Sequence, residues 1–405
     1  MPKNKFAEFL ERKLAFFIFL AIDAICLFLY APDLGVSAKE ARIFFENKEI
    51  LGYILRFSAD IFGQNNFAIR APFIILHLIN LTLVYFVSRD HLTKFDSFLS
   101  ALLFALLPGI NGAALLVSYA PFAILISLIF ILLYKRWENI AIAFLFLTAF
   151  LDNLFSALIL AATIYEIYQK RYRRAVLLSI FIALCYAIHG AEIGGRPRGY
   201  FADIFGLYAA IFSPLIYLYF LYSLYWRLFK NEEKLSLIWF IALVPFLLSI
   251  VLSLRQNLSI ENYAPFAVIA TPLMIRSFMS SLRVRLPRFR KKYFVAAGVT
   301  FLSLITILLL TFFHKPLYLL MSNSGRHFAR EHHFVGDLAA LLKSRGIRAA
   351  IADRNNLSWR LKFYGIERGG EWKVSEKPEN ANSKKIQFFV MDSPAITFYL
   401  TKKSE

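Results

Sequence analysis

Long apolar runs separated by short basic loops restrict the fold of this chain more than any other feature of its sequence. The first run, LAFFIFLAIDAICLFLYA, is close to the length of about 20 residues that a helix needs to cross a bilayer. It lacks a small-residue cleavage site, so we expect it to remain as a membrane anchor. Hydrophobic residues make up 59% of the chain and charged residues 18%, against about a quarter in soluble proteins. The sequence therefore predicts an integral membrane protein.

Apolar runs of about 17 to 25 residues predict about eleven transmembrane helices. These lie near residues 13–30, 68–88, 97–109, 113–134, 139–151, 154–169, 175–189, 205–226, 235–253, 262–280 and 293–313. The third, fifth and sixth are short for a full span.

The Lys and Arg residues predict the orientation, because cytoplasmic loops of membrane proteins are enriched in them. With the N-terminus in the cytoplasm, that side receives the loops SRDHLTK, YKRWEN, YQKRYRR, WRLFKNEEK and RVRLPRFRKK. The first loop and the C-terminal segment then face outward. The formal charge of +19 is explained by topology and by contact with anionic membrane lipids, so we expect no nucleic-acid partner.

The composition changes after residue 313. Residues 326–366 combine apolar residues at helical spacing with the short β-type run IRAAIA, and KIQFFVMD follows further on. We expect a transmembrane domain over residues 1–313 and a small extracytoplasmic α/β domain over 314–405. The predicted fold class is an all-α polytopic membrane protein with a small C-terminal α/β domain.

The stretch SAKEARIFF, residues 37–45, has two compatible interpretations. Ser37 followed three residues later by Glu40 is the capping-box pattern that begins a helix. A carboxylate held just outside the membrane is also placed to accept a proton from an attacking hydroxyl or amine.

Two ionisable residues lie inside predicted spans. Asp23 is about 10 Å from the outer end of the first span at a rise of about 1.5 Å per residue, and His77 has a similar depth in the second. Such groups are costly in a bilayer and usually face a partner or a cavity. We leave open whether they form a structural pair or line a substrate cavity.

Several segments of the chain resemble a known family. Glu40-Ala41 in the outward first loop, the Phe62-Gly63 turn, and Arg70 with Pro72 at the start of the second long helix are similar to the polyprenyl-phosphate-sugar-dependent glycosyltransferases with the C-type membrane fold. ENYAPFAVIATPL is similar to the Tyr- and Pro-bearing late helix of these enzymes, and LKFYGI to the strand-and-Tyr element of their outer domain. The nearest group is that of the protein mannosyltransferases and lipid A aminoarabinose transferases, the family 39-like glycosyltransferases.

The chain departs from this family at four places. Lys39 stands where the family usually has an Asp directly before the Glu, and the first loop has no Pro-Pro element. SYAPFA carries no acid where a second one is expected, and LDNLFS stands where a basic position is expected. The resemblance implies that Glu40 takes the role of catalytic base, with Asp33 as a nearby second carboxylate.

A lipid-linked sugar phosphate would need cations on the outer face. The candidates in outward loops are Arg56, Arg196, Arg198 and Arg255, since Arg suits bidentate phosphate contacts. Solvated loop arginines are the alternative. For metals the sequence offers little: Cys26 and Cys185 lie in apolar runs, and the histidines of REHH (residues 330–333) have no further ligand pattern. We therefore expect no metal site and no cofactor.

The resemblance implies an inner-membrane enzyme of bacteria, a hexosyl- or pentosyltransferase. It would move a sugar from polyprenyl phosphate to an envelope acceptor, a lipid, glycan or protein, on the outer face of the membrane. Two alternatives stay open: a transporter or flippase of a lipid-linked saccharide, and a non-catalytic assembly partner that keeps the fold.

Overall fold

The computed structural model describes residues 13–190, 199–229, 234–317, 332–378, 383–390 and 393–402. Its chain forms two compact units. Unit 1 comprises Met1–Ala24 and Ile75–Leu308, and unit 2 comprises Ile25–Ile74 and Leu309–Glu405. The predicted boundary at residue 313 concerns which residues lie in the bilayer, so it stays a prediction.

The predicted fold class is confirmed: the protein is a multi-pass, mostly helical membrane protein with a small sheet near its C-terminus. Within the described residues, length and composition identify five helical segments able to cross a membrane, and up to seven if each of two bent pairs is one span. The five are Leu14–Asp33, Asn66–Arg89, Tyr172–His189, Ala264–Val284 and Pro287–Phe312. They correspond to α2 (Lys13–Tyr30), α5 (Asn66–Arg89), α11 (Tyr172–His189), α16 (Thr271–Val284) and α17 (Pro287–Phe312), with short adjoining helical turns in the first and fourth segments.

The two bent pairs have proline at their breaks. α6 (Lys94–Leu106) and α7 (Pro108–Leu115) meet at 63°, and α12 (Phe201–Phe212) and α13 (Pro214–Phe229) at 103°. The prediction of one helix over residues 205–226 is therefore wrong. Ser213 has φ of 71°, which is outside the helical region, and the ring of Pro214 disfavours the helical conformation for the residue before it.

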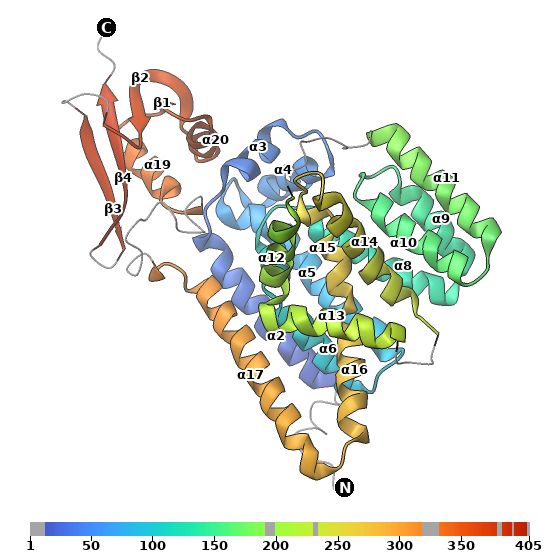
Figure 1. The fold of residues 1–405 in the computed structure, drawn as a ribbon. Coiled ribbons are helices and arrows are strands. Elements are labelled where there is room, and N and C mark those ends of the chain that lie inside the picture. Colours follow the sequence, from blue (N-terminus) through green and yellow to red (C-terminus); the bar gives the residue numbers. More distant parts are fainter. Residues whose placement is uncertain are drawn as a thin grey trace. The chain divides into compact units, whose positions relative to one another are not determined.

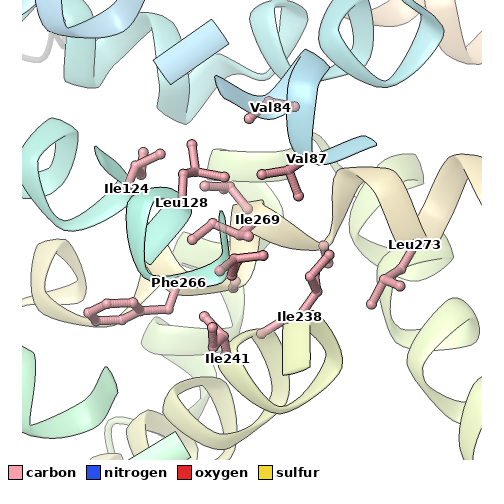
Figure 2. Packing of buried hydrophobic residues seen from close by; sticks show 14 of the residues in the cluster. Val84, Val87, Ile124, Leu128, Ile238, Ile241, Phe266, Ile269 and Leu273 are labelled. Carbon is pink, nitrogen blue, oxygen red and sulfur yellow. The ribbon is translucent and has the colours of Figure 1, made fainter. Parts of the chain in front are cut away.

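Apolar side chains from many helices form the core of unit 1. The further elements of this unit are α8 (Ala120–Arg136), α9 (Glu138–Thr148), α10 (Phe155–Tyr168), α14 (Leu237–Ser253), η2 (Ile260–Asn262), α15 (Ala264–Ala267) and η3 (Val268–Ala270). Figure 2 shows where α5, α8, α14 and the α15–α16 region meet, with Leu128 and Ile269 among buried neighbours. Helix α10 packs against both α11 and α14.

Unit 2 combines short helices with the sheet. Its elements are the end of α2, η1 (Ala31–Asp33), α3 (Ala38–Glu46), α4 (Ile50–Phe62), the start of α5, α19 (Val335–Ser344), α20 (Asn355–Phe363), β1 (Ala349–Ala352), β2 (Glu367–Ser375), β3 (Lys384–Val390) and β4 (Ser393–Lys402). The strand order is β1-β2-β4-β3, with β1 and β2 parallel and the other pairs antiparallel. The predicted strands in IRAAIA and KIQFFVMD are β1 and β3.

The segment LKFYGI is not a strand. Leu361–Phe363 form the end of α20, and Tyr364 follows in the turn that leads to β2. α20 joins the parallel strands β1 and β2 and also packs against α3, as Figure 1 shows. The rings of Phe44 in α3 and Phe363 in α20 meet edge to face with their centroids 5.4 Å apart. This contact brings the turn at Tyr364 to the first loop.

Candidate active site

Glu40 lies in the first turn of α3, where the predicted capping box is present. The Ser37 backbone N–H donates to Glu40 Oε2 at 2.8 Å, and the Glu40 N–H donates to Ser37 Oγ at 3.3 Å. Two helix-terminal donors are thereby satisfied. The carboxylate is held in one orientation by its own helix start.

The partner of Glu40 is Arg70 of α5. The Arg70 guanidinium donates from Nη1 to Oε1 and from Nη2 to Oε2 of Glu40, the latter at 2.8 Å. Nη2 also donates to the carbonyl of Gly35 at 3.0 Å. Arg70 is fully buried and Glu40 is 2% exposed, so the ion pair is shielded from water. A bidentate pair of this kind fixes geometry as well as charge.

The environment makes Glu40 a strong acid. Burial alone would raise the pKa of its carboxyl, but the charge and hydrogen bonds of Arg70, helped by His332 and the Ser37 N–H, lower the pKa to about 2. A catalytic base works best with a pKa near the operating pH. The geometry therefore favours Glu40 as an anchor over Glu40 as a proton acceptor.

Arg70 is positioned by a local feature of α5. Pro72 has no N–H, so the carbonyl of Ala68 four residues earlier lacks its helical donor. The hydroxyl of Ser58 in α4 donates to this carbonyl at 2.6 Å. α4 is thereby tied to α5 one turn before the proline, beside Arg70.

Gly35 joins the first loop to the segment before α19. Its N–H donates to the carbonyl of His332 at 2.9 Å, and Nδ1 of His332 donates to the carbonyl of Gly35 at 2.8 Å. A Cβ on Gly35 would lie 2.5 Å from the His332 carbonyl oxygen, so the approach requires glycine. His332 Nδ1 is 3.8 Å from Glu40 Oε2. Burial lowers the pKa of His332, so the ring is neutral at pH 7.

Tyr364 and Arg360 hold the same loop from the α20 side. The Tyr364 hydroxyl accepts from the Val36 N–H at 3.0 Å and donates to Asn66 Oδ1 at 2.7 Å. Arg360 donates to the carbonyls of Val36 and His333, each at 3.1 Å. Residues 35–37 thus receive contacts from α3, α5, the His332 segment and α20. Burial raises the pKa of Tyr364, so its hydroxyl stays protonated.

The other predicted outward residues are distributed as follows. Asp33 ends η1 with an exposed side chain, and the structure gives no hydrogen bond or ion pair between it and Glu40. Arg56 donates from Nη1 to the carbonyls of Phe44 and Asn47, at 2.9 and 3.0 Å, and so caps the end of α3. Arg255 is exposed in the loop after α14. Arg196 and Arg198 lie outside the described residues.

The predicted intramembrane residues Asp23 and His77 are brought together in unit 1. His77 Nε2 lies 2.8 Å from Asp23 Oδ2. His77 is buried and the Asp23 side chain is 14% exposed. Each polar group therefore has a partner inside an apolar segment.

The part of the chain that the structure describes contains no group of three or more His, Cys, Asp or Glu residues able to hold a metal ion. The two histidines of REHH are used differently: His332 binds the Gly35 carbonyl, whereas His333 Nε2 lies 3.0 Å from Nε2 of His314. Two imidazoles facing each other at this distance share one proton between them.

Sequence reasoning identified Glu40 but not the set of groups around it. The sequence places Arg70 in a family motif at the outer end of a helix, but its partner lies 30 positions away along the chain and is not predicted. Tyr364 and His332 were noted in LKFYGI and REHH, without their contacts to the first loop. Only the capping box, a pattern over four residues, was readable in advance.

The chain is similar to known proteins in one segment of its sequence and in its fold. Residues 50–191 match the family model described as dolichyl-phosphate-mannose-protein mannosyltransferase. None of the curated proteins matches the sequence. The crystal structure of ArnT from Cupriavidus metallidurans bound to undecaprenyl phosphate has 10% identity and a TM-score of 0.58, over 96% of this chain and 98% of that one. ArnT from the same organism in the apo state has 12% identity and a TM-score of 0.52, over 86% and 74%. At these identities the likeness shows a shared fold.

Proposed function

We propose that this chain transfers a sugar from polyprenyl phosphate to an envelope acceptor. Its resemblance to the polyprenyl-phosphate-sugar-dependent glycosyltransferases is confirmed by the family segment at residues 50–191 and by the shared ArnT fold. The observation that carries the proposal is the match over nearly the whole of both chains to a structure that holds undecaprenyl phosphate. The enzyme is a glycosyltransferase of the C-type fold. Whether it moves a hexose or a pentose is left to experiment.

The reaction is a displacement at the anomeric carbon. A bond forms between the acceptor oxygen or nitrogen and this carbon, the bond from the carbon to the phosphate oxygen breaks, and the polyprenyl phosphate leaves with the electron pair. The acceptor proton passes to a base. The printed sequence has no Gly-Lys-Ser/Thr phosphate loop, in keeping with a lipid-linked donor.

We assign the two predicted carboxylates different roles. Glu40, with both oxygens bound and a pKa of about 2, positions the loop of residues 33–37 through Arg70. Asp33 has an exposed carboxylate at the start of this loop, and we propose that it accepts the acceptor proton. A base needs a lone pair that no guanidinium occupies, which favours Asp33 over Glu40.

For the donor phosphate, we propose Arg255 first among the four predicted arginines. Its side chain is exposed, and the structure gives it no hydrogen bond or ion pair with described residues. Arg56 has already committed one Nη nitrogen to two backbone carbonyls. Fixed cations in a site shielded from water stabilise the developing phosphate charge.

The bacterial inner membrane is proposed from the resemblance, and the basic loops support an orientation with the N-terminus in the cytoplasm. In this orientation the α/β segment faces outward, where we propose that it selects the acceptor. Membrane lipids surround the spans and the basic loops meet anionic headgroups.

The test begins with mass spectrometry of polyprenyl-phosphate sugars and envelope glycans in the native host. A deletion strain is complemented with wild type, Asp33→Asn, or Asp60→Asn as the matched control at an exposed aspartate of α4. We expect one lipid-linked sugar to accumulate and the corresponding glycan residue to disappear in the deletion and Asp33→Asn strains only. Unchanged pools in the deletion strain would overturn the transferase function.

A second measurement separates the two carboxylates. With donor and acceptor identified, the pH dependence of transfer by purified protein is compared for wild type and Glu40→Gln. We expect Glu40→Gln to lower the rate and keep the acid limb of the profile. Loss of that limb in Glu40→Gln, or full activity of Asp33→Asn, would contradict the assignment.

A further inference from the structure

Unit 1 contains an apolar cavity of about 430 Å³, lined by residues of α6, α13, α16 and α17. Twelve of its fifteen lining residues are apolar or aromatic. Two of the polar groups in the lining are bound within the protein: the Thr300 hydroxyl donates to the carbonyl of Ala296 at 2.8 Å, and the Tyr219 hydroxyl to that of Met274 at 3.4 Å. The cavity therefore offers a ligand mainly hydrocarbon and aromatic surface.

Helix α17, on one side of this cavity, is the least buried of the five candidate spans. Of its 26 residues, Leu304 alone is buried. Val295, Val299 and Leu302 are each more than half exposed. Figure 1 shows α17 joined to α16 through a single turn. Apolar side chains that face outward on a membrane-spanning helix are covered by lipid, so the bilayer is the natural source of an occupant for the cavity.

The cavity has the depth of one membrane leaflet. Its lining residues on α17 run from Tyr293 to Phe301, which is about 12 Å along the helix axis. The hydrocarbon of one leaflet is about 15 Å thick, half of the bilayer core. Tyr222, Trp226 and Tyr293 belong to the lining, and such side chains favour the boundary between membrane and water. These dimensions suit an acyl chain that enters from one leaflet.

The turn between α16 and α17 places a cation against the cavity lining. The Arg285 guanidinium lies over the Tyr293 ring, 4.3 Å from its centroid. Arg290 donates to the carbonyls of Arg285 and Arg283, at 2.7 and 3.1 Å, and so fixes the turn. Arg283 in turn pairs with Asp96 of α6 at 2.6 Å. The Arg285 side chain remains exposed at this end of the cavity.

The sequence around this turn is strongly basic. From Arg276 to Phe301 it has seven Lys and Arg residues and no Asp or Glu. Arg288, Lys291 and Lys292 are exposed, as Arg285 is. Basic side chains beside a membrane attract anionic headgroups, whereas a zwitterionic headgroup has no net charge to be attracted. By the orientation predicted from the basic loops, this end of the cavity faces the cytoplasmic leaflet.

We propose that the cavity binds an anionic phospholipid of the cytoplasmic leaflet. One acyl chain lies between α13, α16 and α17, and the phosphate group lies at Arg285 and Arg288. The bound lipid fills the space beside α17 and stabilises the packing of this helix. The proposal goes beyond the proposed function and does not depend on it, because neither the sugar donor nor the acceptor takes part.

The test uses the fluorescence of Trp226, which lines the cavity. The full chain in detergent micelles is titrated with phosphatidylglycerol brominated on its acyl chain, since bromine quenches an indole that it contacts. The difference between wild type and Trp226→Phe gives the contribution of Trp226. We expect quenching at a concentration at least about tenfold lower than with brominated phosphatidylcholine. Equal quenching by the two lipids, or no difference between the two proteins, would overturn the proposal.

Charge variants test the headgroup site. In Arg285→Gln/Arg288→Gln we expect the preference for phosphatidylglycerol over phosphatidylcholine to fall below about threefold. Arg173→Gln, at an exposed arginine of α11 in another basic loop, is the matched control and keeps the full preference. A thermal melt establishes that each variant is folded. An unchanged preference in the folded double variant would refute the role of the turn.

A second variant locates the acyl chain. Ala297→Phe fills part of the cavity without changing any charge, and we expect it to abolish quenching of Trp226 by brominated phosphatidylglycerol. Val299→Phe, at an exposed position of the same helix, is the matched control and keeps the quenching. Undiminished quenching in folded Ala297→Phe would show that the acyl chain lies elsewhere.

Competition separates a phospholipid from a prenyl lipid. Unlabelled phosphatidylglycerol should restore the fluorescence of Trp226, whereas undecaprenyl phosphate at the same concentration should not. Restoration by undecaprenyl phosphate at a lower concentration than phosphatidylglycerol would assign the cavity to a prenyl phosphate and overturn the proposal. Because no transfer is measured, phospholipid binding by a protein that transfers no sugar would contradict only the proposed function. Transfer by a protein without this binding would contradict only the lipid site.

Discussion

The buried pair of Glu40 and Arg70 makes a quantitative prediction about Glu40→Gln. Glutamine keeps the length of the side chain and can still accept from the Ser37 N–H in a capping box. It removes the negative charge that faces a fully buried guanidinium. In this variant the positive charge of Arg70 would stay buried without the opposite charge of Glu40. Arg70 Nε already has no hydrogen-bond partner, so it does not compensate for that loss. We expect Glu40→Gln to destabilise unit 2.

The magnitude follows from the titration of Glu40. Its pKa falls from 4.5 to about 2, and each pKa unit corresponds to about 1.36 kcal/mol, so the fold stabilises the carboxylate by about 3 kcal/mol. Removal of one partner from a buried pair generally costs about 3 to 5 kcal/mol, in agreement. Because the folded-state pKa is the lower one, this stability is present above about pH 4.5 and is lost as the pH falls toward about 2.

Hydrogen exchange of α3 measured by mass spectrometry is the direct assay. A loss of about 3 kcal/mol corresponds to exchange about 100-fold faster in peptides that cover Ala38–Glu46. Glu46→Gln is the control in the same helix: its ion pair with Arg42, at 2.6 Å, is exposed and contributes at most about 1 kcal/mol. Exchange in Glu40→Gln less than about threefold faster than in wild type would refute the reasoning.

Three further predictions concern the same loop. Gly35→Ala should lower the melting temperature and abolish transfer because its Cβ would lie 2.5 Å from the His332 carbonyl oxygen, whereas Gly206→Ala, with no atom within 4 Å of the added Cβ, should leave both intact. Tyr364→Phe loses two hydrogen bonds and should lower the free energy of unfolding, measured by chemical denaturation, by about 1 to 3 kcal/mol. Tyr172→Phe, at an exposed tyrosine, should leave this free energy unchanged. Burial lowers the pKa of His332, so unfolding experiments should show stability falling as the pH drops through about 6.5, less steeply in His332→Asn; equal slopes would contradict this.

The apolar runs predicted the positions of most helices of unit 1, because such runs are long and uninterrupted in a membrane protein. About eleven spans were expected, whereas within the described residues five segments, or up to seven with the bent pairs, are long and apolar enough to cross a membrane. Two further features were not predicted. The break at Ser213 depends on one positive φ value before a proline, and strand β2 has two adjacent glycines and several charged residues, with little β-type pattern. At Gly370 a Cβ would lie 3.0 Å from the carbonyl oxygen of Ala349, at the irregular register of β1 and β2.

Within the site, the sequence predicted what is local. The capping box spans four residues and Asp23 and His77 were matched by depth, so both could be anticipated. The contacts of Arg70, His332 and Tyr364 with the first loop join segments tens to hundreds of positions apart. Sequence periodicity does not predict such contacts. Only the folded chain shows that both carboxylate oxygens of Glu40 accept hydrogen bonds.

Adjacent positions of α3 have opposite environments, and this gives the last prediction. Glu40 is buried against Arg70, whereas Lys39 is exposed at the position where the resembling family carries its acid. Consecutive helical residues point about 100° apart, so a carboxylate at position 39 would not join the buried pair. If Asp33 supplies the missing base, Lys39→Asp should restore transfer to an Asp33→Asn protein. The purified double variant is assayed beside Asp33→Asn/Lys39→Asn, which removes the same positive charge without adding a base. Equal transfer rates for the two double variants would show that a carboxylate at position 39 cannot reach the reacting group of the acceptor, and that the base lies elsewhere in the fold.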